Sequence, residues 1–109
     1  MRKINLKDLT NNGEVRNLSG HERGHAAREK YDLDDLDRTG EDVCIIVPSD
    51  VYAITPSFFQ GMFSESVNRA GSRDIFLNQF KFDAPVVVLK QIERGIEMSL
   101  MKRESVLVT

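Results

Sequence analysis

The run Val43–Val47 is the feature that most constrains how this chain can fold. Its residues are all apolar, and most of them are β-branched. A continuous run of this kind is typical of a strand in the centre of a parallel or mixed sheet, where both faces are covered. Pro48-Ser49-Asp50 ends the strand, and Val51–Ile54 predicts a buried connector or an extension of it. The rest of the chain therefore has to supply elements that cover this strand.

The segment Thr55-Pro56-Ser57 is the clearest helix start in the chain. A threonine can cap free N–H groups, and proline suits the first helical position because its missing N–H has no intrahelical partner. Gly71 predicts the end of the helix. Between them, apolar residues at helical spacing form one wide face: Phe58, Phe59, Met62, Phe63, Val67 and Ala70.

The N-terminal residues predict two short strands. Apolar and polar residues alternate over Lys3–Leu9, which is the period of a half-buried strand. Asn11-Asn12-Gly13 follows, and these residue types tolerate the positive φ that tight turns require. Glu14–Leu18 is then predicted as a short return strand.

A helix is predicted from about Gly20 to about Tyr31. Ser19 and Glu22 form a capping-box pattern, in which a hydroxyl and a carboxylate satisfy free backbone N–H groups. The acidic stretch Asp32–Asp37 fits either a short helical turn or a loop. It lacks the glycine and glutamate spacing of an EF-hand, so we interpret it as solvated rather than as a cation site.

The C-terminal third predicts one more strand and one more helix. Asp74–Phe82 has apolar residues on both faces and is predicted as a strand, with Phe76, Phe80 and Phe82 in the core. An edge strand carrying these rings would also support a homodimer. The last helix begins near Pro85 and runs to about Arg103, and Ser105–Thr109 is a short strand or a frayed tail.

Strands that alternate with helices predict an α/β fold. We expect a small mixed sheet of about four or five strands with three helices, in a single domain over residues 1–109.

Composition excludes several function classes. Fifteen Lys and Arg oppose 17 Asp and Glu, and this balance argues against a dedicated nucleic-acid binder. The apolar runs are too short for a transmembrane helix, and the first residues lack the apolar stretch of a signal peptide. Cys44 has no second cysteine to pair with and is predicted as a buried structural thiol. These features predict a cytoplasmic protein with no membrane partner.

His21-Glu22-Arg23-Gly24-His25 matches the zincin pattern His-Glu-x-x-His. On a helix, His21 and His25 would lie one turn apart and could ligate zinc, with Glu22 as the general base. A third ligand would have to come from Asp32–Asp37. Only 20 residues precede the motif, and Arg23 is a charged residue at a spacer position that is normally apolar. The other interpretation is two surface histidines beside a capping glutamate, and the context favours it.

Ser57 falls in the first turn of the predicted helix. Free N–H groups and the positive end of the helix dipole lie there, and both would stabilise a phosphate on its hydroxyl. Serine is also an ordinary residue at this position, and spacing alone favours that simpler interpretation.

Two stretches of the chain carry a family resemblance. Ile45–Val51 contains the end of the buried strand followed by Val51, and Ile54–Phe59 contains an Ile-Thr-x-Ser-Phe helix start. Upstream, Gly20, Gly24 and Arg28 form a Gly-x-x-x-Gly-x-x-x-Arg helix start. Together these motifs resemble the STAS-like family of uncharacterised bacterial domains, over about Ile4 to Leu100. They also give a non-metal explanation of the His-Glu-x-x-His match.

The chain departs from this family at two acidic positions. Val47-Pro48 stands where the family often has Asp-Phe, and Phe59–Gly61 replaces an acidic residue after the Ser-Phe pair. No role of those acidic groups is carried over to this chain.

The resemblance implies a fold related to STAS domains, the anti-sigma-factor antagonists. Those domains use a serine at a helix N-terminus as a phosphorylation switch, and ATPase-type serine kinases are their partners. Ser57 matches that position, with Thr55 as the neighbouring alternative and Phe58 as the second residue of the Ser-Phe pair.

The sequence therefore predicts a bacterial regulatory domain that binds a protein, either an ATPase-type serine kinase or an anti-sigma factor, without catalysis or a cofactor. The competing hypothesis is a small zinc-dependent hydrolase that uses Glu22, His21 and His25. A third hypothesis is a structural or homodimeric protein with no switch.

Overall fold

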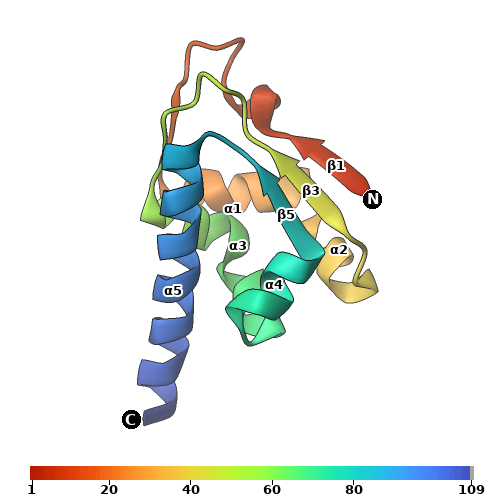
Figure 1. The fold of residues 1–109 in the computed structure, drawn as a ribbon, viewed down its shortest axis with the longest axis vertical. Helices are drawn as coiled ribbons and strands as arrows, with labels where there is room; N and C mark the ends of the chain where they lie inside the picture. The colour runs from red at the N-terminus through yellow and green to blue at the C-terminus, as the bar shows by residue number, and fades with distance from the viewer. Residues whose placement is uncertain (109) are drawn as a thin grey trace.

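Three parallel strands form the larger sheet of the protein (Figure 1). In this computed structural model, residues 1–108 are described, with side chains for residues 1–101. β3 (Val43–Ile46) lies between β1 (Arg2–Asn5) and β5 (Phe80–Asp83), and both pairs are parallel. The central position predicted for the Val43–Val47 run is confirmed.

A second, shorter sheet continues beyond the first. β2 (Asn17–Leu18) pairs in parallel with β4 (Ala53–Ile54). The segment Glu14–Leu18 therefore does not return antiparallel to β1, as a hairpin would. The prediction of a mixed sheet of four or five strands is wrong, because the described strands form one sheet of three and one of two, all parallel.

The first predicted strand is shorter than expected. β1 stops at Asn5, whose side chain accepts a hydrogen bond from the N–H of Lys7 at 2.9 Å and caps the 3₁₀ helix Leu6–Leu9. Asn11 and Asn12 have φ of 50° and 60°, so the turn predicted there is confirmed.

Five α-helices occur among the described residues, where three were expected. They are α1 (His21–Lys30), α2 (Leu33–Thr39), α3 (Pro56–Ala70), α4 (Arg73–Gln79) and α5 (Val86–Val108). The α/β class is confirmed. α5 runs beside the sheet and extends past the rest of the molecule (Figure 1). No described helix combines the length and apolar character that a membrane crossing needs.

The predicted strand Asp74–Phe82 is wrong for most of its length. Ser72 accepts a hydrogen bond from the N–H of Ile75 and begins α4, so only the last part of the segment is a strand. Phe76 and Phe80 are buried and four residues apart, which is helical spacing, whereas Ile75 is 60% exposed. Phe76 and Phe80 lie in the core, but β5 is an edge strand of the larger sheet and also carries the half-buried Phe82, so a homodimer through this edge stays a prediction.

The ends of two other helices also differ from the prediction. Gly20, with φ 94°, occupies the N-cap position of α1 and supplies no side-chain hydrogen bond, so the Ser19 capping box is wrong. α5 confirms the last helix, and residues 105–108 belong to it rather than to a final strand. Thr109 lies outside the described residues.

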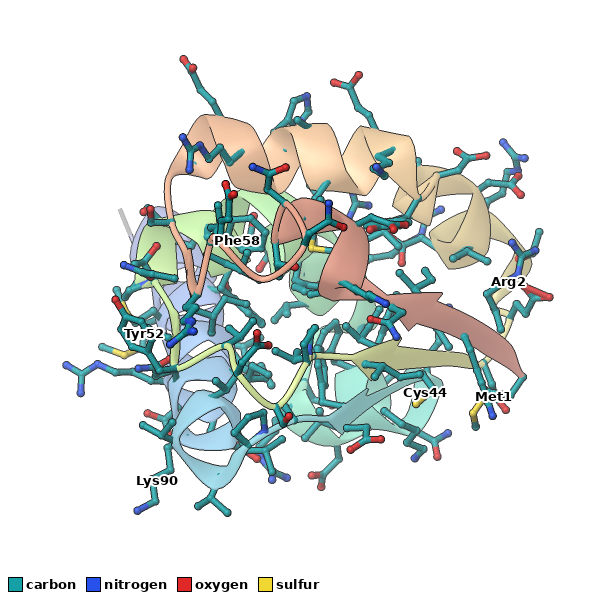
Figure 2. The ribbon with its side chains drawn as sticks, turned by 90° about the horizontal axis from the view of Figure 1, so that it is seen from above. Met1, Arg2, Cys44, Tyr52, Phe58 and Lys90 are labelled. Atoms are coloured by element: carbon teal, nitrogen blue, oxygen red, sulfur yellow. The ribbon has the colours of Figure 1, made fainter. Side chains whose placement is uncertain are left out.

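Only one face of the larger sheet is fully covered. Val43 and Ile45 are completely buried, but Cys44 and Ile46 point to the other face and are half-buried. Lys3 and Lys81 flank Cys44 on the neighbouring strands. No described helix crosses in front of the strands in Figure 1, and Figure 2 shows Cys44 near the surface. The prediction that both faces of this strand are covered, with Cys44 buried, is therefore wrong.

Aromatic packing fills the covered side. The rings of Phe63, Phe76 and Phe80 contact one another with centroids 5.0 to 6.1 Å apart, mostly edge to face. Gly95 of α5 makes room for a further ring, since an added Cβ would lie 2.5 Å from Phe59 Cδ1. This core ties α3, α4, α5 and β5 together.

α1 and α3 cross in direct backbone contact. A Cβ added to Gly24 would lie 2.1 Å from the carbonyl oxygen of Phe58, and one added to Gly61 would lie 2.2 Å from that of His21. Both distances are far below van der Waals contact, and a backbone atom cannot rotate away as a side chain can. Only glycine at both positions permits this crossing.

We expect Gly61→Ala to lower the free energy of unfolding by about 3 kcal/mol, because it overpacks a backbone contact. A loss of stability would point to the close helix contact. Without that contact the substitution should raise the free energy of unfolding, because alanine favours a helix over glycine by about 1 kcal/mol. Chemical denaturation followed by circular dichroism measures the change. Ser64→Ala, on the same helix, is the control and should stay within about 0.5 kcal/mol of the parent. An unchanged denaturation midpoint for Gly61→Ala would show that the close crossing is not required.

Candidate functional site

The start of α3 is fixed to the smaller sheet. Thr55 occupies the N-cap position, and its Oγ1 accepts a hydrogen bond from the N–H of Phe58 at 3.3 Å. Its own N–H donates to the carbonyl of Leu18 at 2.8 Å. Pro56 follows at the first helical position. The helix start predicted from Thr55-Pro56-Ser57 is confirmed, and Thr55 itself is a structural cap.

Ser57 is exposed at this end of the helix. Its Oγ lies 3.2 Å from Thr55 Oγ1, within hydrogen-bonding distance. The first turn of α3 contains no acidic residue. A hydroxyl placed in this way is accessible to an enzyme, and a phosphate on it would meet the positive end of the helix dipole.

Exposed apolar side chains accompany the helix start. Tyr52 is 60% exposed and comes directly before β4, and Val87 is 49% exposed in the first turn of α5. Gln91 joins these segments, because its Oε1 accepts a hydrogen bond from the N–H of Ile54 at 2.7 Å. Figure 2 shows Tyr52 on the side of the molecule where α5 begins. Two segments that are held together and each carry a large exposed apolar residue are a candidate interaction surface.

Phe58 does not belong to that surface. Only 2% of it is exposed, and its ring lines a pocket on the other side of the helix start. The structure therefore gives Phe58 a packing role and not that of an exposed contact.

His21, Glu22 and His25 lie on the exposed side of α1. The His25 Nε2 is 2.8 Å from the carboxylate of Glu29, one turn further along the helix. Within the described part of the chain, no group of three or more His, Cys, Asp and Glu side chains is placed to hold a metal ion. The structure thus brings no third ligand to the two histidines.

Arg28 is a buried arginine that lies between three helices. Only 3% of its side chain is exposed. Its guanidinium donates to Asp34 Oδ1 at 2.8 Å and to Asp37 Oδ2 at 2.6 Å. It also donates to the Met62 carbonyl and to Ser66 Oγ, each at 2.9 Å. Arg28 thereby joins α1, α2 and α3.

The charges around Arg28 compensate for its burial. Desolvation lowers the pKa of the guanidinium, but the hydrogen bonds to Asp37 and Asp34 outweigh it, so the pKa is raised above its ordinary value. The Asp37 side chain is only 2% exposed and also accepts a hydrogen bond from Ser66 Oγ at 2.7 Å. Of the two alternatives predicted for the acidic stretch, the short helix is confirmed as α2, and the interpretation of the stretch as solvated holds for Asp34 but is wrong for the Asp37 carboxylate, which is buried.

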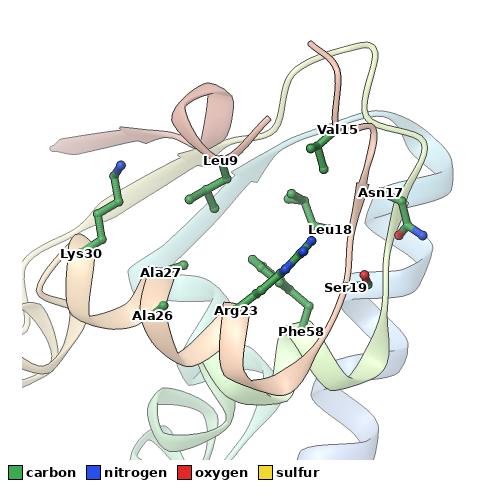
Figure 3. Close-up of a pocket in the computed structure, with 10 residues that line it drawn as sticks. All are labelled: Leu9, Val15, Asn17, Leu18, Ser19, Arg23, Ala26, Ala27, Lys30 and Phe58. Atoms are coloured by element: carbon green, nitrogen blue, oxygen red, sulfur yellow. The ribbon is translucent and has the colours of Figure 1, made fainter. Parts of the chain in front are cut away.

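A pocket of about 340 Å³ lies between α1 and the segments that precede it (Figure 3). Apolar side chains form most of its wall: Leu9, Val15, Leu18, Ala27 and Phe58. Lys30 stands at one end of the pocket and Arg23 lies nearer its middle, both on α1, and none of the lining residues is acidic.

Sequence reasoning missed this pocket. Its wall comes from segments far apart in the chain, so no local motif marks it. The one available signal was Ala26-Ala27 between Arg23 and Lys30, a pair of small residues flanked by two cations two helical turns apart.

Comparison with known proteins gives no assignment: no family model, no curated protein and no solved structure matches this chain.

We expect Arg28→Met to cost about 3–5 kcal/mol of stability, because it leaves the Asp37 carboxylate buried without its counter-charge. Adding Asp37→Asn to that variant should recover part of the loss, since a neutral amide is cheaper to bury. Thermal and chemical denaturation of the two variants measure both effects.

Arg38→Met is the matched control for this prediction. Arg38 pairs with Asp35 on the surface, with 72% of its side chain exposed, and such pairs contribute at most about 1 kcal/mol. Equal losses for Arg28→Met and Arg38→Met would contradict the central role of Arg28.

The zinc-hydrolase hypothesis has its own test. We expect protein purified and dialysed against zinc to retain no stoichiometric metal by elemental analysis, because His21 and His25 lack a third ligand among the described residues. Near-equimolar zinc in the parent protein that is lost in a His21→Ala, His25→Ala variant would contradict this expectation and support the zinc-hydrolase hypothesis.

Proposed function

We propose that this chain is a non-catalytic protein-interaction domain of bacterial regulation, and that Ser57 is its phosphorylation switch. The interaction surface consists of the start of α3 with the preceding loop and the first turn of α5. The observation that carries the proposal is the exposure of Ser57 on a helix start that Thr55 fixes to the smaller sheet.

Local geometry supports a phosphate at Ser57. Pro56 has no N–H, and Thr55 already caps Phe58, so the N–H of Ser57 is a free donor of the first turn. A phosphate would add about −1.5 to −2 charges at neutral pH. It would do so without touching the core, because Ser57 is exposed. Modification would add negative charge to the surface and leave the fold intact.

The exposed apolar residues supply the affinity that such a surface needs. Tyr52 and Val87 provide area that a partner can bury, and aromatic residues are enriched among those that dominate interface energies. The new charge at Ser57 would then weaken binding to a partner with an apolar or acidic patch.

The family resemblance supports the same proposal. The Ile-Thr-x-Ser-Phe stretch at Ile54–Phe58 and the α/β class agree with a STAS-related regulatory domain. We propose an ATPase-type serine kinase or an anti-sigma factor as the partner and the cytoplasm as the location. The open edge of β5 would be the surface for a homodimer.

We expect Ser57→Asp to weaken partner capture at least several-fold, whereas Ser57→Ala should bind like the parent protein. Quantitative pull-down from the native cells compares the three proteins. Both variants should unfold within about 1 kcal/mol of the parent, as exposed helix-start changes usually do.

Asn78→Asp is the matched control, because it adds one negative charge at an exposed position of α4. It should leave partner capture unchanged. If Ser57→Asp and the parent retain the same partners equally well, Ser57 is only a helix-start residue and the proposed switch does not exist.

A further inference from the structure

We propose that the pocket between α1 and the 9–19 segment binds a small amphipathic carboxylate of the medium-chain fatty acid type. The alkyl chain would lie on the apolar wall, and the carboxylate would pair with Arg23. This site is separate from the Ser57 surface, and the proposal does not depend on that switch.

The core of the protein fixes the apolar wall of the pocket. Leu18, Ala27 and Phe58 are 1 to 3% exposed, so their positions are set by the core behind them. Leu9 and Val15 close the opposite side (Figure 3). The volume of about 340 Å³ falls in the range of roughly 300–1,000 Å³ that is usual for small-molecule sites. An alkyl chain would lose its contact with water here at little ordering cost to the protein.

The charge at the pocket is positive and uncompensated. Arg23 is exposed and has no hydrogen bond or ion pair to any side chain that the structure describes. In Figure 3 it extends toward Leu18 and Phe58, across the apolar wall. Lys30 lies two turns further along α1, with its ammonium 5.9 Å from the Tyr31 ring centroid. No acidic residue lines the pocket, so Arg23 and Lys30 attract an anionic head group, and the nearest opposing charge in the first turn of α1 is Glu22, beside Arg23.

The start of α1 adds to this attraction. Gly20 caps the helix without a side-chain hydrogen bond, so the first N–H groups are left to a ligand or to solvent. Arg23 belongs to the same turn. A carboxylate at Arg23 would therefore also be stabilised by the positive end of the helix.

The side chains that line the pocket also favour a ligand with an apolar chain over a polar one. The polar groups at the pocket are few, with Ser19 and Asn17 beside the two cations. A nucleotide or a sugar needs many more hydrogen-bonding partners than these. An apolar chain with one anionic end matches the apolar wall and the two cations, whereas Asn17 Oδ1, which is buried with no hydrogen-bond partner among the described side chains, is an acceptor and would not pair with the carboxylate.

The test is a titration of the full chain with decanoate, followed by two-dimensional NMR, at concentrations below micelle formation. We expect saturable shifts confined to the pocket residues. Decanol, the neutral analogue, should bind at least about tenfold more weakly, because a charge-assisted hydrogen bond is lost. Arg23→Gln should weaken decanoate binding by about the same factor and leave decanol binding unchanged.

Two variants complete the experiment. Ala26→Phe places a ring in the pocket from an exposed position and should abolish decanoate binding. Arg94→Gln, on the exposed side of α5, removes one cation away from the pocket and should bind decanoate like the parent. If Ala26→Phe fails to fold, the comparison of decanoate with decanol still decides the question.

Any of three results would overturn the proposal. These are shifts scattered outside the pocket, equal affinity for decanol and decanoate, and equal effects of Arg23→Gln and Arg94→Gln.

Discussion

The backbone contact between α1 and α3 is the constraint on which the rest of this structure depends. Gly24 and Gly61 bring the two helices so close that a methyl group at either position would overlap a carbonyl oxygen. Arg28 lies one turn beyond Gly24, and this short interhelical distance lets its guanidinium reach the Met62 carbonyl and Ser66. The buried ion pair with Asp37 then holds α2 against both helices. A larger residue at the crossing would separate these groups and leave two charges buried without partners.

The same crossing positions both proposed sites. Phe58 connects them: its carbonyl oxygen faces Gly24, its side chain lines the pocket beside α1, and it directly follows Ser57 in the chain. The pocket and the exposed hydroxyl of Ser57 thus share the first turn of α3, which Thr55 attaches to β2. A ligand that packs against Phe58 and a phosphate on Ser57 would act on the same short segment from two directions.

The structure also explains motifs that had two interpretations. In His21-Glu22-Arg23-Gly24-His25, the residue with a clear structural role is Gly24, whereas the two imidazoles are exposed. The acidic stretch owes its pattern to Arg28, because Asp34 and Asp37 both accept its hydrogen bonds. The Gly-x-x-x-Gly-x-x-x-Arg spacing therefore has a physical reason: it places a close-contact residue and a buried cation one turn apart on the same side of α1.

The sequence by itself determined the elements whose signals are local. The β-branched run Val43–Val47, the Thr55 cap and the Gly71 stop each act within a few residues of where they stand, and all three were predicted correctly. The prediction of a strand over Asp74–Phe82 was wrong for most of its length. The apolar residues of this segment fit both the helical and the strand periodicity, and the cap at Ser72 favours a helix. The open face of the sheet, the Arg28–Asp37 pair and the pocket could be decided only by the tertiary structure. Each depends on which segments the Gly24–Gly61 crossing brings together, and that distance is set by contacts between residues far apart in the chain.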